Sequence, residues 1–191
     1  MTFAKFDRTA GGIGWSVTKT AKCRLVGMGR QDTERIVEMD QDMLARITLL
    51  ENRLAIQDLR HRYWLAIVER DLETMMACYG ETVHSQFGYG GEYKSRHELR
   101  EFYRRQMSER GVAAQVPFGT NGLVTFIDET HAKGSWLISV VYIKEGAKHG
   151  TRNNVRYHET YVKVEDGWKI ASQIVDYLCF EETTPVGSPH G

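Results

Sequence analysis

Three side chains, His158, Tyr63 and Asp176, have types and positions that could support acid–base chemistry. His158 alternates with Val162 and Val164, so the three share one face of a predicted strand, and the valines predict that this face is inward. A histidine with a pKa of about 6.5 acts as acid or base at neutral pH. The alternative is a histidine at the edge of the core that hydrogen-bonds to a neighbouring strand.

Tyr63 and Asp176 are candidates for the second polar group. Tyr63 lies on the apolar stripe of a predicted helix, where its hydroxyl could polarise a carbonyl in a pocket. It could equally be a core aromatic whose hydroxyl meets a backbone group. Asp176 is in step with Ile170 and Ile174, and an inward carboxylate is costly unless it is paired, which makes it a candidate base. A bulge in the strand would instead place it in water.

The first elements that must position these groups are helices. Apolar residues recur at three- and four-residue steps from Met43 to Ile67, which predicts a long amphipathic helix. Asp71 is a predicted N-cap for a short second helix. Ser95 and Glu98 have the spacing of a capping box at the start of a third helix. The stripe of the first helix begins with Leu44, Ile47, Leu50 and Leu54.

Long strands follow the helices. The stretches GLVTFID, SWLISVVYIK, VRYHETYVKV and WKIASQIVDYL are rich in β-branched and aromatic residues, and an Asp-Gly turn joins the last two. This order predicts an α+β fold in which long antiparallel strands coil around the helices and leave a pocket at the open end. Residues 1–40 are predicted to be a poorly ordered extension, residues 43–181 the domain and residues 182–191 a flexible tail.

The composition argues against several classes of function. Basic and acidic residues number 25 each, so the formal net charge is zero, which argues against nucleic-acid and membrane-surface binding. No apolar run approaches the roughly 18 residues of a membrane span. Cys23, Cys78 and Cys179 are spaced as expected of free thiols in a cytoplasmic protein. The histidines lack metal-binding spacing and no cofactor motif is present, so neither a metal nor a cofactor is predicted.

Two stretches carry a resemblance to a known family. ENRLAIQDLRHRYWLAIVERDLETMMACY resembles the opening helices of the SnoaL-like group of the nuclear-transport-factor-2-like superfamily, and YHETYVKVEDGWKI resembles its penultimate hairpin. The likeness runs from about residue 43 to residue 181. It implies a cone-shaped, curved antiparallel sheet wrapped around three N-terminal helices, a cystatin-like α+β barrel. This fold serves polyketide cyclases, ketosteroid isomerases, scytalone dehydratase, a lindane dehydrochlorinase and non-catalytic binding proteins, so it does not fix the function.

The dehydratase-like relatives use an Asp–His dyad, and this sequence departs from it at both positions. Counting from Ala55 in AIQDL, the place of the aspartate is Val68. The place of the histidine, on a turn before a strand, is Pro117 in VPFGTN. A shift of one helical turn would bring Asp71 into the site, although its capping role is sufficient to explain it.

The resemblance implies a cofactor-independent lyase, isomerase or cyclase that acts on a hydrophobic cyclic substrate, with His158 as acid or base and Tyr63 or Asp176 beside it. The rival hypotheses are a non-catalytic ligand-binding or assembly protein and an oxygenase β-subunit-like partner. A pocket lined by aromatic residues without a convergent acid–base pair would favour binding. The predicted ligand-binding residues are Tyr89, Phe118, Asn121, Trp64, Tyr142, Val68 and Pro117.

A homodimer or homotrimer is also expected from the resemblance, since several members of the superfamily associate through the outer face of the sheet. Tyr157, Tyr161 and Trp136 are the aromatic residues that could supply such a face. The expected partners are thus a hydrophobic small molecule and further copies of the chain, with no nucleic acid and no membrane.

Overall fold

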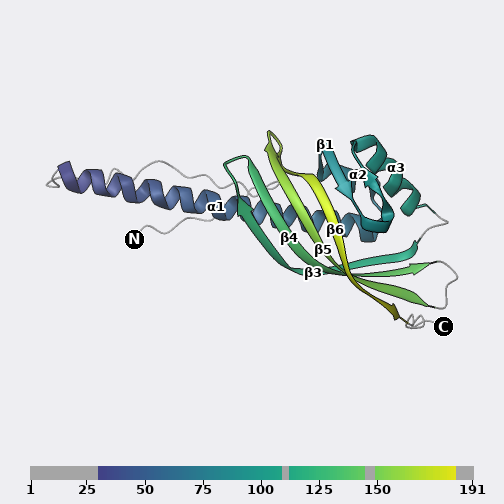
Figure 1. The fold of residues 1–191 in the computed structure, drawn as a ribbon. Coiled ribbons are helices and arrows are strands. Elements are labelled where there is room, and N and C mark those ends of the chain that lie inside the picture. Colours follow the sequence, from purple (N-terminus) through teal and green to yellow (C-terminus); the bar gives the residue numbers. More distant parts are fainter. Residues whose placement is uncertain (1–29, 109–111, 145–148, 184–191) are drawn as a thin grey trace, which may run out of the picture. The chain divides into compact units, whose positions relative to one another are not determined.

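The computed structural model describes residues 30–108, 112–144 and 149–183 (Figure 1). The chain divides into two compact units, Met1–Met43 and Leu44–Gly191. The packing described below belongs to the second unit. No helix in the described ranges is long and apolar enough to cross a membrane.

The described part of the chain holds three α-helices, as predicted. The first helix begins earlier than expected, so residues 30–40, predicted to be part of a poorly ordered extension, are helical. The rest of that prediction, residues 1–29, lies outside the described residues. The bounds are Arg30–Glu69 for α1, Leu72–Ala77 for α2 and Arg96–Gln106 for α3.

Side-chain caps fix where the two short helices begin. The Asp71 carboxylate accepts hydrogen bonds from the Thr74 backbone N–H at 3.0 Å and from its hydroxyl at 2.6 Å, and these bonds lower the pKa of Asp71. Ser95 accepts from the Glu98 N–H at 3.2 Å, and Glu98 accepts in return from the Lys94 N–H at 2.8 Å. Both predicted caps are confirmed, because each satisfies a backbone donor that the helix leaves unpaired.

The apolar stripe of α1 has two different environments in the second unit. Ile56, Leu59, Tyr63 and Ile67 are buried under the sheet. Leu44, Ile47, Leu50 and Leu54, which continue the same spacing, are 44% to 63% exposed. The periodicity therefore predicts the helix correctly but does not reveal which part of its apolar face is covered.

Six strands in the described ranges form one curved, mixed sheet with the order β2-β1-β6-β5-β4-β3. Neighbouring strands are antiparallel except β1 and β6, which are parallel. The expectation of a purely antiparallel sheet is therefore wrong at this one pair. The bounds are Tyr79–Gln86 for β1, Glu92–Tyr93 for β2, Val112–Phe126 for β3, His131–Lys144 for β4, Gly150–Val164 for β5 and Gly167–Thr183 for β6.

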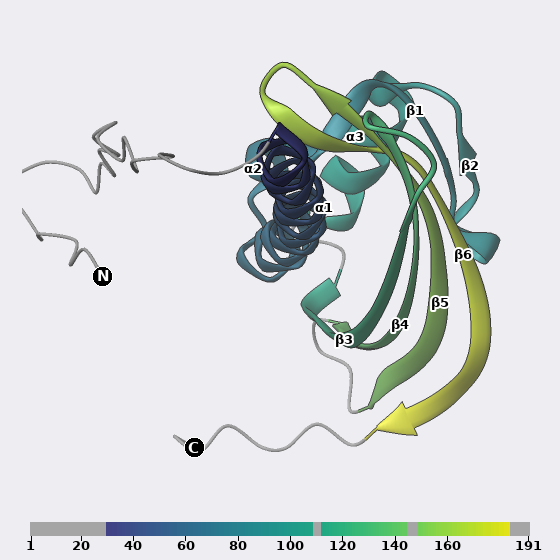
Figure 2. The same cartoon turned by 90° about the vertical axis from the view of Figure 1, so that its left-hand side faces the viewer.

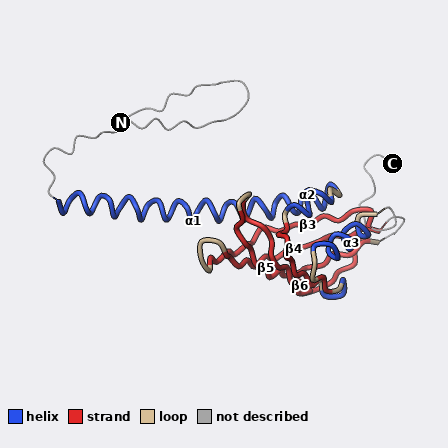
Figure 3. The backbone as a smooth tube through the Cα atoms, turned by 90° about the horizontal axis from the view of Figure 1, so that it is seen from above, coloured by secondary structure: helices blue, strands red, loops and turns tan. Residues whose placement is uncertain are grey.

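The strands curve over the C-terminal half of α1, which lies on their concave side (Figure 2). Helices α2 and α3 pack against each other and against β1 (Figure 1). Figure 3 distinguishes the helices from the strands by colour. A short 3-10 helix, Gly88–Gly90, links β1 to β2. Strand β6 runs to Thr183, two residues into the predicted tail, and residues 184–191 lie outside the described part.

Strand β3 begins ten residues earlier than predicted, so VPFGTN is part of a strand rather than a turn before one. Pro117 pairs with Val140 of β4 on one side. Because β3 is an edge strand with one neighbour, no strand on its other side needs a hydrogen bond from the N–H that proline lacks.

The sides of β5 are opposite to those predicted. Tyr157, Glu159 and Tyr161 alternate on the buried face. His158 does share a face with Val164, as expected, but that face is the exposed one. Tyr157, Tyr161 and Trp136 are at most 9% exposed, so the outer dimer face predicted from them is wrong. Self-association itself stays a prediction.

Candidate functional site

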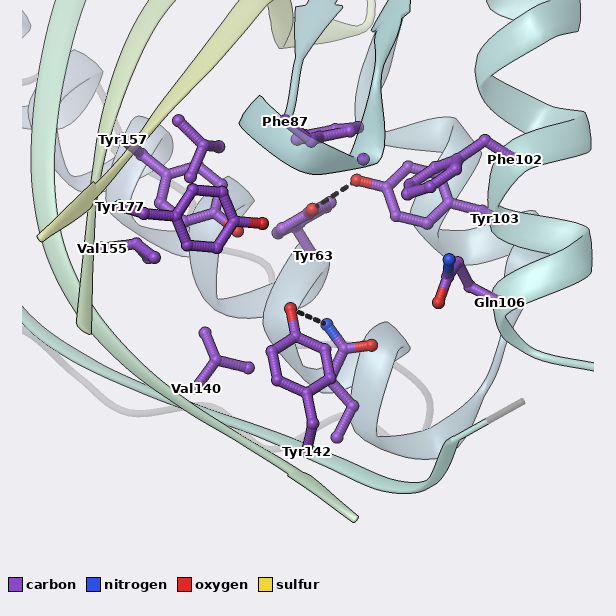
Figure 4. A pocket seen from close by; sticks show the side chains of 13 residues that line it. Tyr63, Phe87, Phe102, Tyr103, Gln106, Val140, Tyr142, Val155, Tyr157 and Tyr177 are labelled. Atoms are coloured by element: carbon purple, nitrogen blue, oxygen red, sulfur yellow. Dashed lines mark hydrogen bonds between the residues drawn. The ribbon is translucent and has the colours of Figure 1, made fainter. Parts of the chain in front are cut away.

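A cavity of about 170 Å³ lies between α1, α3 and the concave face of the sheet (Figure 4). Helices α1 and α3, strands β3 to β6 and the segment after β1 all contribute side chains to its lining, and five of the lining residues are tyrosines. None of the described residues that line it is charged or a histidine. The lining residues are Tyr63, Phe87, Gly90, Phe102, Tyr103, Gln106, Gln115, Val140, Tyr142, Val155, Tyr157, Val175 and Tyr177.

A chain of hydrogen bonds leads from the cavity wall into the core. The hydroxyls of Tyr63 and Tyr103 are 2.7 Å apart, and that of Tyr79 lies 3.1 Å from Tyr103 (Figure 4 shows the first of these bonds). Tyr79 donates to Gln173 Oε1 at 2.9 Å. The Gln173 amide then donates to Glu159 Oε1 at 2.6 Å, directly across the β5–β6 pair.

At the inner end of the chain, Glu159 forms a fully buried ion pair. Arg60 Nη1 lies 2.9 Å from Glu159 Oε1, and neither side chain has exposed surface. Tyr161 donates its hydroxyl proton to the other carboxylate oxygen and accepts from Trp136 Nε1 at 2.7 Å. The carboxylate thus has a partner at each oxygen, as a buried charge requires.

Aromatic rings surround the Arg60 guanidinium. Its central carbon lies 4.6 Å from the Tyr63 ring centroid and 5.2 Å from that of Tyr157, and both of these rings also line the cavity. Trp64 and Trp136 complete the box at 4.8 and 5.8 Å. Burial disfavours the charge, but Glu159 and the tyrosines outweigh it and raise the pKa of Arg60. The guanidinium is therefore a permanent cation behind the cavity wall.

Glycines make room for the aromatic part of this site. A Cβ at Gly122 of β3 would overlap the ring of Trp136, and one at Gly134 of β4 would lie 2.8 Å from the Tyr161 ring. Both glycines allow a large ring to lie flat on the sheet backbone. That placement brings the Trp136 N–H to the Tyr161 hydroxyl, and so orients the group that donates to Glu159.

The tyrosine hydroxyls keep their protons at neutral pH. Burial raises the pKa of Tyr63, although the Arg60 charge opposes this, and it raises the pKa of Tyr103 and Tyr157 well above the usual value. Tyr142 accepts a hydrogen bond from Gln115 Nε2 at 3.3 Å, and burial raises its pKa as well. The cavity wall consequently offers neutral hydroxyls rather than phenolates.

The structure places the two remaining catalytic candidates away from the cavity. His158 Nε2 lies 2.9 Å from Asp176 Oδ2, with 47% and 57% of the two side chains exposed. Ile170 faces inward, but an extra residue in β6 shifts the pairing beside it, so that Gln173 and Val175 face inward after it. The bulge considered for Asp176 is therefore present, and the inward orientation predicted for His158 is wrong.

Only some of the predicted ligand-binding residues line the cavity. Tyr142 lines the cavity together with the catalytic candidate Tyr63. Trp64 is buried behind the wall against Arg60, and Pro117 is half-buried in β3 outside the lining. Val68 and Phe118 are 48% and 61% exposed, so they do not form the pocket. The side chains of Tyr89 and Asn121 lie outside the described part of the structure.

Five residues of the polar chain were not identified from the sequence. Arg60 falls on the buried phase of α1, four residues after Ile56 and three before Tyr63, and Glu159 stands between two tyrosines in YHETY. A charged residue of each sign at an inward position is a recognisable signal for a buried pair. The residues missed are Arg60, Tyr79, Tyr103, Glu159 and Gln173. Among the described residues no group of side chains is arranged to hold a metal ion.

Comparison with solved structures finds the same fold in several proteins of low sequence identity. A candidate scytalone dehydratase from Novosphingobium aromaticivorans is 16% identical, with a TM-score of 0.67 over 75% of this chain and 98% of that one. A hexachlorocyclohexane dehydrochlorinase, LinA type 2, is 15% identical, with a TM-score of 0.68 over 75% and 98%. A candidate dehydratase of the nuclear-transport-factor-2-like family from Streptomyces avermitilis is 15% identical, with a TM-score of 0.57 over 65% and 94%.

Sequence comparison agrees with the structural comparison. Among the curated proteins no relative matches the chain. The sequence model of the SnoaL-like domain matches residues 48–173, which run from within α1 to within β6 and include the buried ion pair described above. The chain belongs to the SnoaL-like domain family.

Proposed function

We propose that this protein binds a small, largely apolar ring compound in the tyrosine-lined cavity and holds it without chemical change. The observation that carries the proposal is the lining itself, which contains hydroxyls, amides and apolar groups but no carboxylate, imidazole or amine among the described residues. Neutral tyrosines are suited to orient a ligand, whereas proton transfer at carbon needs a group that titrates near the working pH.

The buried Glu159 does not supply the missing base. Its carboxylate is engaged by Arg60 and Tyr161, and the amide of Gln173 stands between it and the tyrosines. A carboxamide neither takes up nor releases a proton near neutral pH, so it interrupts a proton path that a hydroxyl or a water would continue. Glu159 therefore anchors the wall of the cavity rather than serving the ligand.

The size of the cavity limits the ligand. An apolar protein cavity of about 150 Å³ binds benzene, and the volume here is about 170 Å³. One six-membered ring with small substituents fits this space. Val140, Val155 and Val175 supply apolar contact from the sheet, and Phe87 and Phe102 supply it from the opposite side.

A second candidate is a cofactor-independent lyase, isomerase or cyclase, the kind of activity named for two of the structural neighbours. One observation favours it. Tyr142 accepts from Gln115, which leaves its own proton for a ligand, and the Tyr157 hydroxyl donates to no described residue. Two such donors could polarise a carbonyl and assist loss of a proton from the neighbouring carbon.

Thermal unfolding with single-ring and fused-ring compounds tests the proposal. A single-ring ligand at about 100 times its Kd adds roughly 2.7 kcal/mol, which raises the midpoint by about 5 to 10 °C in a chain of this size. Val175→Phe fills the cavity and should abolish the shift, whereas Leu178→Phe, on an exposed position of the same strand, should retain it. A shift that survives Val175→Phe would place the ligand elsewhere.

Mass spectrometry of the bound compound after incubation separates the two candidates. Recovery of the unchanged ligand supports the binding protein. A product whose formation is lost in Tyr142→Phe, while the compound still binds, would replace the binding function with the lyase-type activity.

A further inference from the structure

The hydrogen-bond chain behind the cavity has a fixed direction. A carboxylate can only accept hydrogen bonds, so Glu159 obliges Gln173 to turn its NH₂ group toward β5 and its carbonyl oxygen toward the tyrosines. That oxygen lies within reach of two hydroxyls, Tyr79 at 2.9 Å and Tyr63 at 3.4 Å. The Gln173 carbonyl oxygen therefore accepts hydrogen bonds from the tyrosine hydroxyls, and the amide donates none to them.

The tyrosine cluster has fewer hydroxyl protons than hydrogen-bonding contacts. Three hydroxyls, those of Tyr63, Tyr79 and Tyr103, each carry one proton. They make four contacts with one another and with Gln173, at 2.7, 2.9, 3.1 and 3.4 Å. Three protons can fill three of the four contacts, and whichever contact stays empty, all three protons are used inside the cluster. The shortest three are filled when Tyr63 donates to Tyr103, Tyr103 to Tyr79, and Tyr79 to Gln173.

The cavity therefore has two walls of different hydrogen-bonding character. On the side of α1 and α3, Tyr63 and Tyr103 present lone pairs, because their protons point into the core. On the sheet side, Tyr142 accepts from Gln115 and keeps its own proton for the cavity. Figure 4 shows Tyr63 and Tyr103 bonded to each other on one side, and Tyr142 with its own hydrogen bond on another.

We infer that the cavity selects ring compounds carrying a hydroxyl group, of the phenol class, because such a hydroxyl donates to Tyr63 while its oxygen accepts from Tyr142. This inference rests on the proposed binding function and adds the polar group by which the ligand is recognised. An ether or a carbonyl oxygen can accept from Tyr142 or from the Gln106 amide, but facing Tyr63 it meets lone pairs. A ligand with no polar group leaves both walls unpaired.

Three compounds of similar size test the inference by titration calorimetry with the full chain. Phenol both donates and accepts, anisole only accepts, and toluene does neither. One net hydrogen bond corresponds to a preference of about threefold to tenfold. We expect phenol to bind more tightly than anisole by that factor. In Tyr63→Phe the preference should fall to nearly one, because the oxygen that accepts from the ligand hydroxyl is gone.

Two further variants distinguish recognition from a structural effect. Tyr142→Phe, on the opposite wall, should weaken phenol and anisole alike and so keep their ratio. Gln173 does not line the cavity, but Gln173→Met removes the acceptor at the end of the chain, so the three hydroxyls keep only the two contacts through Tyr103 and one proton can turn to an ether oxygen. The phenol-to-anisole ratio should fall in this variant. If Gln173 only supported the fold, the affinities for all three compounds would drop together and the ratio would stay.

Different results contradict the binding of single-ring compounds and the selection of their hydroxyl group. If none of the three compounds binds, the proposed single-ring ligand is wrong. If all three bind with equal affinity, or if Tyr63→Phe keeps the preference for phenol, the cavity binds rings but the directed chain does not select them. Each variant is first checked for an unchanged unfolding midpoint without ligand. Tyr63→Phe and Gln173→Met each keep most of the side-chain volume, so failure of one to fold leaves the other to decide.

Discussion

Two acid–base pairs lie on consecutive residues of β5 and differ in almost everything except distance. Glu159 meets Arg60 at 2.9 Å with no exposed surface on either side chain. His158 meets Asp176 at 2.9 Å with about half of each side chain in water. The alternation of a strand sends neighbouring residues to opposite faces, so one residue step separates the core from the solvent.

The comparison shows that separation alone says little about the energy of an ion pair. The exposed pair exchanges good hydration for a screened attraction and gains little. The buried pair has already lost its hydration, so each member depends on the other and on the neutral groups around it. In this protein those neutral groups, Gln173 and Tyr161, are also the ones that reach the cavity wall or the aromatic box around Arg60.

The largest expected effect comes from removing one member of the buried pair. Arg60→Met keeps most of the apolar contact with the rings but leaves the Glu159 carboxylate buried without its cation. We expect a loss of about 3 to 5 kcal/mol in the free energy of unfolding, measured by urea denaturation. The double variant Arg60→Met with Glu159→Gln removes the stranded charge and should recover more than half of the loss. A double variant as unstable as the single one would show that the charge is not the cause.

An intermediate effect is expected at the neutral groups that support the buried pair. Tyr161→Phe removes the hydroxyl that donates to Glu159 and accepts from Trp136 Nε1, so two buried polar groups lose a partner. The expected cost is about 1 to 3 kcal/mol in the free energy of unfolding. Thr160→Val, which removes the half-buried hydroxyl bonded to Ser172, is the matched control and should cost less. A larger loss of stability in Thr160→Val than in Tyr161→Phe would mean that burial does not determine the cost of removing the hydroxyl.

The smallest effect is expected at the exposed pair. His158→Ala should change the free energy of unfolding by no more than about 1 kcal/mol, because exposed pairs are screened by water and salt. The affinity for a cavity ligand should be unchanged, since His158 does not line the cavity. Calorimetric titration with the same ligand measures this directly. A loss of binding in His158→Ala would show that His158 contributes to the ligand site.

The sequence predicts the family and the local signals well. Asp71 and Ser95 cap their helices as expected, because a cap depends only on residues three or four positions away. The facing of β5 is predicted wrongly, because Val162 and Val164 look like core residues and Glu159 does not. What makes Glu159 a core residue is Arg60, 99 positions earlier, and only the folded chain brings the two together. The exposure of the first half of the α1 stripe could not be predicted for the same reason, since periodicity does not show which residues a sheet covers.

The parallel pairing of β1 with β6 has a consequence for the order in which the protein folds. Tyr79 and Gln173, which bond across this part of the molecule, are 94 residues apart in the chain. Contacts of such long sequence separation are slow to form, because the loop between them must close first. The strands β3 to β5 can assemble as consecutive hairpins, but the polar chain stays open until the last strand docks beside β1. A ribosome must therefore release nearly the whole domain before the cavity has its full wall.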